Sequence, residues 1–148
     1  MTMPRKKGKE PIDILLVDDN PADIRLTQEA FKEVTIRSTL HIVRDGAEAL
    51  SFLQRTDRFS AAPRPDLILL DLNLPKKDGR EVLAELKNSP AFKSIPIVIL
   101  TTSSAEEDIR HTYNHHANCY ITKPADLDEF IDVVKQIEQF WLSIVQLP

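Results

Sequence analysis

The chain has 148 residues, of which 42% are hydrophobic and 28% charged, and its net charge is −4. This length suits one ordinary domain with its own hydrophobic core, and the composition excludes a disordered or fibrous protein. No apolar run approaches the roughly 20 residues that span a bilayer, and no signal-peptide pattern opens the chain. We therefore expect a cytoplasmic protein without membrane contacts, and the single Cys119 fits a reducing compartment.

The first ten residues form a basic segment ahead of an acidic body. Residues 1–10 hold four basic residues and one acidic residue, which leaves 15 basic and 22 acidic residues, or −7, in the rest of the chain. We interpret this segment as a flexible, solvated tail. A nucleic-acid-binding arm is the alternative, but the acidic body would repel phosphates. We therefore expect no direct nucleic-acid binding.

Five short apolar runs predict β-strands. In chain order they are Ile12–Val17, Ser38–Val43, Asp66–Leu72, Ile95–Leu100 and Asn118–Thr122. The first, third and fourth contain "ILLV", "LILL" and "IVIL", which are apolar throughout, as strands covered on both faces must be. The second alternates apolar and polar residues and is expected at an edge of the sheet.

A signal for the start of a helix follows each strand. It consists of an Asn, Asp or Ser with an acidic residue three positions later, which fits or approximates a capping box. The pairs are Asn20 and Asp23, Asp45 and Glu48, Asp78 and Glu81, Ser103 and Glu106, and Asp126 and Glu129. Pro21 stands where the first residue of a helix is expected, and helical apolar spacing follows.

Five strand–helix units predict an α/β protein with a parallel sheet between two layers of helices. We expect a flavodoxin-like (βα)5 three-layer sandwich whose five strands have the order 2-1-3-4-5. The predicted domain spans residues 11–138. Residues 139–148 are interpreted as an apolar C-terminal extension of the last helix.

Polar residues follow the predicted ends of four strands, namely Asp18 and Asp19, Asp71, Thr101, and Lys123. The carboxyl ends of parallel strands meet at one edge, near the point where the strand order reverses. Two carboxylates ~4 Å apart repel by about 4 kcal/mol at an effective dielectric near 20, so a cation should join them. Mg²⁺, for which Mn²⁺ can substitute, suits such oxygen ligands. The alternative is that each acid merely starts a helix at its strand–helix junction.

The distribution of glycine argues against a bound nucleotide. The chain has three glycines, none of them directly after the first strand, so that loop has no backbone cradle for phosphates. We expect the phosphoryl group on the protein instead, with Asp71 as the nucleophile that forms an acyl phosphate. Lys123 and Thr101 can then donate hydrogen bonds to the phosphoryl oxygens.

Four segments resemble, in order and spacing, the receiver domain of two-component response regulators. They are "LLVDDN", "LLDLNLPKKDG", "VILTTSS" and "CYITKP", and the resemblance runs from about Pro11 to Gln139. It implies that a sensor histidine kinase phosphorylates Asp71 and that the chain is a signalling switch, not an enzyme, apart from self-catalysed phosphoryl transfer and hydrolysis.

The resemblance also implies roles for single residues. Asp71, Asp19 and the backbone carbonyl of Asn73 would bind Mg²⁺ directly, and Asp18 would bind it through water. Tyr120 matches the aromatic residue that turns inward when the threonine, here Thr101, is drawn to the phosphate. The peptide between Lys123 and Pro124 matches one that is usually cis in the family. The surface expected to switch is that of the fourth helix, the fifth strand and the last helix.

The segment "DDNPADIRLTQEAF" and the C-terminal stretch are similar to the small response regulators that work with bacterial phytochromes, best known in cyanobacteria. This similarity implies that the kinase is a light sensor. One departure is Leu72, where some members of the family carry tryptophan beside the phosphoacceptor.

The last predicted helix carries two apolar stripes. One stripe could face the body of the protein and contains Leu127, Ile131, Val134, Trp141 and Val145. The other has the spacing of a coiled-coil seam and contains Phe130, Val133, Ile137, Phe140, Ile144 and Leu147. We predict a homodimer through the fourth-helix, fifth-strand and last-helix face, with the second stripe contributing. The alternative is that this stripe packs on its own sheet.

Three other functions fit parts of the sequence. A phosphohydrolase that forms an aspartyl phosphate would have a second Asp two residues after the nucleophile, where this chain has Asn73. A DNA-binding regulator would need a helix-turn-helix, for which no residues remain after the last helix. A monomeric receiver could act by binding a motor or an enzyme.

Overall fold

The computed structural model describes residues 11–35, 37–101, 119–124 and 126–145, without the side chains of residues 101 and 142–145. The strands are β1 (Ile12–Val17), β2 (Ser38–Val43), β3 (Leu67–Leu70), β4 (Ile97–Thr101) and β5 (Cys119–Thr122). The helices are α1 (Pro21–Phe31), α2 (Gly46–Gln54), the short 3₁₀ helix η1 (Asp57–Phe59), α3 (Gly79–Lys87) and α5 (Leu127–Val145).

The strands form one parallel sheet in the order β2-β1-β3-β4-β5, which confirms the predicted topology. In the sheet Val17 lies beside Val43 on one side and Leu70 on the other, so the ends of β1, β2 and β3 are level. β4 begins two residues later than predicted. Pro96 explains this difference, because proline has no N–H to donate to a neighbouring strand.

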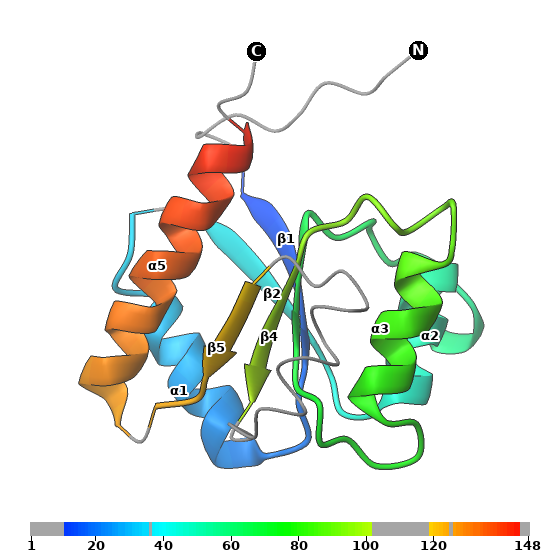
Figure 1. Cartoon of the computed structure of the whole chain (residues 1–148), viewed down its shortest axis with the longest axis horizontal. Helices are drawn as coiled ribbons and strands as arrows, with labels where there is room; N and C mark the ends of the chain where they lie inside the picture. Colours follow the sequence, from blue (N-terminus) through cyan, green and yellow to red (C-terminus); the bar gives the residue numbers. More distant parts are fainter. Residues whose placement is uncertain (1–10, 36, 102–118, 125, 146–148) are drawn as a thin grey trace.

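Helices cover both faces of the sheet, with α1 and α5 on one side and α2 and α3 on the other (Figure 1). Neighbouring residues of each central strand point to opposite sides. Ile14 and Leu16 join the core under α1 and α5, whereas Leu15 and Val17 join the core under α2 and α3. Covering both faces requires strands that are apolar throughout, as the sequence predicted.

The predicted helix caps are present wherever the structure describes them. Asn20 accepts hydrogen bonds from the backbone N–H groups of Ala22 and Asp23. The corresponding donors are Glu48 for Asp45, Arg80 for Asp78, and Glu129 for Asp126. The predicted pair Ser103 and Glu106 lies outside the described residues.

Helix α5 corrects the interpretation of its apolar stripes. Phe130, Val133 and Ile137 are 0%, 9% and 2% exposed, so the expectation that they form an outward seam is wrong. They belong to the core that α5 shares with the sheet and α1, together with Val134 and Trp141 from the other stripe. Residues of both stripes are buried because α5 packs against the sheet and against α1, and one narrow stripe would cover only one of these neighbours.

The remaining positions of the two stripes are less buried or not described. Phe140 is half-buried against the same core, and Leu127, which was expected to face the body, is 38% exposed. The side chain of Ile144 and the whole of Leu147 lie outside the described residues. Helix α5 runs without a break across the predicted boundary between residues 138 and 139. Among the described residues, no helix has both the length and the apolar character needed to cross a membrane.

Replacing Phe130 with alanine should lower the free energy of unfolding by about 3–5 kcal/mol, because it deletes a fully buried aromatic side chain. The control is Gln136→Ala at an exposed position on the same helix, which should change it by less than about 1 kcal/mol. Urea unfolding followed by circular dichroism measures both. Similar small effects for the two variants would contradict the assignment of Phe130 to the core.

Candidate functional site

Four acidic side chains and one lysine gather where the strands end. Asp18 and Asp71 directly follow β1 and β3, and their backbone N–H groups continue the hydrogen bonding of the sheet by donating to the carbonyls of Val43 and Val17. One carboxylate oxygen from each of Asp18, Asp19 and Asp71 lies within 4.8 Å of the other two. The predicted convergence of these three acids is therefore confirmed.

Lys123 follows β5 and lies at the centre of the cluster. Its ammonium nitrogen is 2.8 Å from Asp18 Oδ2, 2.9 Å from Asp71 Oδ2 and 2.9 Å from Asp23 Oδ2. The lysine side chain is only 3% exposed. An ammonium group has three N–H donors, so three carboxylates occupy them all.

The contact of Asp23 with Lys123 was not predicted, because the spacing of Asp23 from Asn20 fits a helix cap. The residue lies in the first turn of α1, four residues after Asp19. The first turn of such a helix lies over the carboxyl edge of the sheet, but an acidic residue there also fits a helix cap, so its position alone does not assign it to the site. The partner is 100 residues away in the chain, so no local pattern reveals it.

Each of the two buried acids is oriented by the backbone as well as by the lysine. Asp18 Oδ1 accepts the N–H of Asn20 at 3.0 Å, and Asp71 Oδ1 accepts the N–H of Asn73 at 3.1 Å. Their Oδ2 atoms contact Lys123. Short side chains commonly bond the backbone two residues later in this way. The carboxylates are therefore held in fixed orientations.

Burial and charge oppose each other in this cluster. Burial raises the pKa of Asp18, an effect that Lys123 opposes and the nearby charge of Asp71 reinforces. For Lys123 burial alone would lower the pKa, but hydrogen bonds and charge from Asp18, Asp23 and Asp71 together raise it well above its usual value. One ammonium leaves an excess of negative charge. A set of carboxylate oxygens with that excess, opened to solvent by the exposed Asp19, fits a hard divalent cation.

Two further predicted residues lie close to this edge of the sheet. Thr101 ends β4 beside Thr122 of β5, and its side chain is not among those described. Tyr120 of β5 is half-buried against the core under α2 and α3. The Lys123–Pro124 peptide is trans, so the expectation of a cis bond is wrong. Trans is the intrinsically favoured form of such a bond, by about 0.5–1 kcal/mol.

Two glycines hold the loop between β3 and α3 in place. Gly79 donates its N–H to the carbonyl of Leu72, and a Cβ at Gly79 would lie 2.2 Å from the carbonyl oxygen of Asp71. A Cβ at Gly46 of α2 would lie 2.1 Å from the carbonyl oxygen of Lys77. The loop that carries Asn73 is thus in direct backbone contact with both helices.

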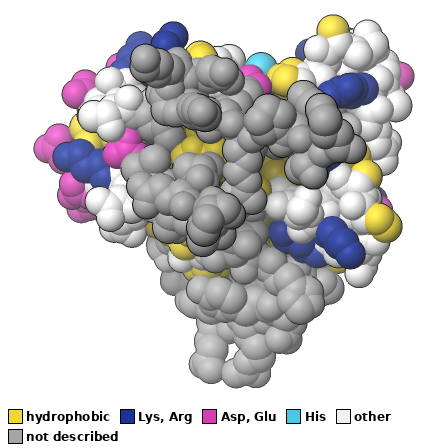
Figure 2. All heavy atoms as spheres, turned by 90° about the horizontal axis from the view of Figure 1, so that it is seen from above, with side chains coloured by type: hydrophobic (Ala, Val, Ile, Leu, Met, Phe, Trp, Pro, Cys, Tyr) yellow, Lys and Arg dark blue, Asp and Glu magenta, His cyan; other side chains and the backbone are white. Residues whose placement is uncertain are grey.

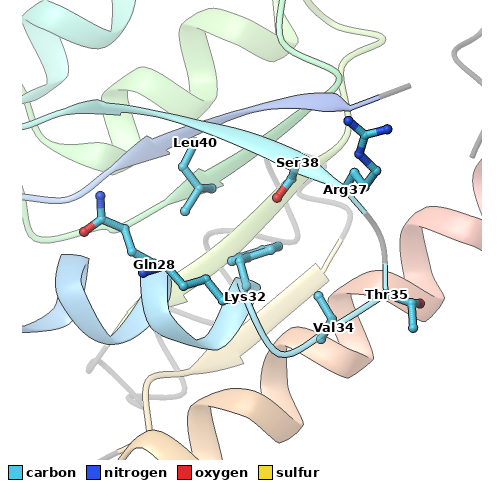
Figure 3. Close-up of a pocket in the computed structure, with 8 residues that line it drawn as sticks. Gln28, Lys32, Val34, Thr35, Arg37, Ser38 and Leu40 are labelled. Atoms are coloured by element: carbon cyan, nitrogen blue, oxygen red, sulfur yellow. The ribbon is translucent and has the colours of Figure 1, made fainter. Parts of the chain in front are cut away.

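A separate hollow lies at the other end of the sheet, near the start of β2. Its volume is about 530 Å³, and its lining includes Lys32, Arg37, Ser38 and Leu40 (Figure 3). No acidic residue lines it, so it offers none of the carboxylate chemistry found at Asp71.

Figure 2 views the molecule from the end where the strands begin, and basic and acidic side chains lie next to one another on part of this face.

Comparisons with known proteins agree on one family. Residues 14–135 match the response regulator receiver domain. Response regulator Rcp1 of Synechocystis sp. is 54% identical over 142 residues, which cover 96% of this chain and 97% of Rcp1.

Solved structures give the same result. The phosphorylated cyanobacterial phytochrome response regulator RcpA has a TM-score of 0.86 at 55% identity, covering 94% of this chain and 99% of RcpA. The Mn²⁺-bound form of Rcp1 has a TM-score of 0.84 at 54% identity, covering 93% of this chain and 99% of Rcp1.

Replacing Gly79 with alanine should lower the free energy of unfolding by about 1–3 kcal/mol, because the new Cβ collides with the backbone of Asp71 and Leu72. The control is Glu81→Gln, which keeps the hydrogen-bonding capability of an exposed position in the same helix turn and where a change within about 0.5 kcal/mol is expected. Urea unfolding measures both variants. A Gly79→Ala protein as stable as the wild type would show that the loop between β3 and α3 can shift to accommodate the new Cβ.

Proposed function

The chain belongs to the response regulator receiver domain family and is a phosphoacceptor switch of two-component signalling rather than an enzyme, and on this premise we propose that Asp71 carries the phosphoryl group. The observation that supports Asp71 most directly is its position. It is a buried carboxylate at the end of a central strand, held between the backbone of Asn73 and the ammonium of Lys123. The kinase that phosphorylates it is a sensor histidine kinase.

The proposed metal is Mg²⁺, for which Mn²⁺ can substitute. Asp19, Asp71 and the backbone carbonyl of Asn73 would bind it directly, and Asp18 through water. The carboxylates within 4.8 Å of one another support this assignment, as does the relative Rcp1, which has been solved in a Mn²⁺-bound form. A bound divalent cation neutralises charge on the transferring group.

The proposed reaction uses the side chains already held at the strand ends. An oxygen of Asp71 attacks the phosphorus of a phosphohistidine on the kinase, and the P–O bond forms as the P–N bond breaks. The histidine nitrogen keeps the bonding electrons and takes a proton from solvent. Lys123 and Thr101 donate hydrogen bonds to the phosphoryl oxygens. Water later attacks the phosphorus, which releases inorganic phosphate and restores the Asp71 carboxylate.

The proposed switch links this chemistry to the surface around β5. Phosphorylation adds about −1.5 to −2 charge at Asp71, which draws Thr101 toward the phosphate. Tyr120 then moves to a different packing, and with it the surface of the fourth helix, β5 and α5. The half-buried position of Tyr120 supports such a movement. The predicted fourth helix falls in residues 102–118, outside the described residues.

The proposed kinase is a phytochrome light sensor, because the similar proteins include a cyanobacterial phytochrome response regulator. The proposed location is the cytoplasm, where such a kinase obtains ATP. The boundaries at residues 10 and 138 remain predictions.

We also propose a homodimer, without direct nucleic-acid binding. Its interface would comprise the fourth helix, β5 and α5, as the sequence predicted, but without Phe130, Val133 and Ile137. Leu127 supports this surface, since it is the exposed large hydrophobic side chain among the described residues and lies at the start of α5. The half-buried Phe140 could contribute at the other end of the helix.

Incubation with acetyl phosphate and Mg²⁺ should add the mass of one phosphoryl group to the wild type. Asp71→Asn should show no gain, because an amide cannot form the acyl phosphate, and omission of Mg²⁺ should suppress the gain in the wild type. Intact-mass spectrometry measures each sample. An equal gain in the Asp71→Asn variant would assign the phosphoryl group to another residue.

Leu127→Arg should shift the protein from dimer to monomer in sedimentation velocity, because it puts a charge into the proposed apolar contact. Gln136→Arg introduces the same charge at an exposed position on the opposite side of α5, about 180° around the helix axis from Leu127. This variant should leave the dimer intact. The proposed interface would be wrong if the wild type sediments as a monomer, or if the Leu127→Arg variant sediments as the same dimer as the wild type.

A further inference from the structure

The three partners of Lys123 differ in what the reaction requires of them. Asp71 is the proposed phosphoacceptor and Asp18 the proposed metal ligand, so both have roles of their own. Asp23 is 2.9 Å from the ammonium, and its only described ion pair is with Lys123. Its side chain is 20% exposed, compared with 1% for Asp18 and 7% for Asp71. Of the three carboxylates, Asp23 is therefore the one that water can most easily solvate.

The start of α1 explains why the Asp23 carboxylate is available to the lysine. The sequence pattern predicts that Asp23 accepts a hydrogen bond from the backbone N–H of Asn20, the cap residue. In the structure that N–H donates to Asp18 Oδ1 instead, at 3.0 Å. The backbone of Asp23 remains fixed, because its N–H donates to Asn20 Oδ1 and its carbonyl accepts from the Thr27 hydroxyl. The side chain extends from this fixed backbone to Lys123.

Phosphorylation creates a demand for the same ammonium. A phosphoryl oxygen on Asp71 needs an N–H donor from Lys123, and all three donors are already occupied. A new hydrogen bond therefore displaces an old one. Asp71 carries the phosphoryl group and Asp18 is a proposed metal ligand, so the hydrogen bond displaced is the one to Asp23. The phosphoryl group also brings negative charge toward Asp23, which adds repulsion to the competition.

We propose that Asp23 is a positioning residue that holds the Lys123 ammonium in the unphosphorylated state and releases it when Asp71 receives the phosphoryl group. The proposal rests on the proposed role of Asp71. Its consequence is that Asp23 opposes phosphorylation: the contact that stabilises the resting site has to break before Lys123 can bind the phosphate. Removing the charge of Asp23 should therefore favour the phosphorylated state.

The test compares Asp23→Asn with the wild type in two measurements. One is the affinity for beryllofluoride in the presence of Mg²⁺, by isothermal titration calorimetry. The other is the rate of mass gain with acetyl phosphate. Both should increase in Asp23→Asn, the affinity by about tenfold, because the hydrogen bond that has to be broken is no longer charge-assisted. A merely structural role would move both in the opposite direction, since a loosened site binds beryllofluoride less well.

Two further variants make the test specific. Asp23→Glu keeps the charge within reach of Lys123 and should return the affinity toward that of the wild type. Glu29→Gln removes one acidic charge from an exposed position on the same helix and should leave both measurements unchanged. An equal increase in Glu29→Gln would attribute the effect to net charge and overturn the proposal. Circular dichroism checks the fold, and Asp23→Ser replaces Asp23→Asn if the latter does not fold.

Failure of this inference can be told apart from failure of the proposed function. If Asp71→Asn prevents the mass gain but Asp23→Asn behaves like the wild type or binds beryllofluoride less tightly, the role of Asp23 is wrong and that of Asp71 stands. If the double variant Asp23→Asn, Asp71→Asn still gains a phosphoryl group, the assignment of Asp71 is wrong, and the inference fails with it.

Discussion

The site depends on one buried ammonium shared by three carboxylates. Taking any of these charges out of water alone would cost several kcal/mol, and the cluster forms because each charge has a partner of opposite sign. The strand order makes the sharing feasible, since it brings the ends of β1, β3 and β5 to one edge of the sheet. The three partners of Lys123 and the neighbouring Asp19 carry more negative charge than one ammonium neutralises, and a divalent cation at the proposed site would offset the remainder.

Most of the fold follows from patterns that are local in the sequence. The strands are continuous apolar runs, and the helices begin at residues that cap them, so element types and strand order could be predicted. The apolar stripes of α5 were misinterpreted for a physical reason. A helical pattern reveals how much of the surface is apolar, but not whether the second stripe covers another chain or, as here, a neighbouring helix such as α1.

The site shows the same division between local and long-range information. Asp18, Asp19, Asp71 and Lys123 could be found because each lies within two residues of the end of a strand. Asp23 could not, because its position also satisfied a simpler interpretation as a helix cap. The structure replaces that interpretation with a contact to a residue that is distant in the chain. Local rules fail at the place where the side chains serve the site instead of the helix.

The contact between Gly79 and the Asp71 carbonyl also bears on how a signal could leave this site. With no side chain between the backbone of the acid and the first residue of α3, there is no soft layer to absorb a displacement. If a new substituent on Asp71 displaced its backbone, the displacement would be passed directly to the first residue of α3. A change in the state of the acid could thus be passed to the α3 side of the protein, in addition to the β5 side of the proposed switch.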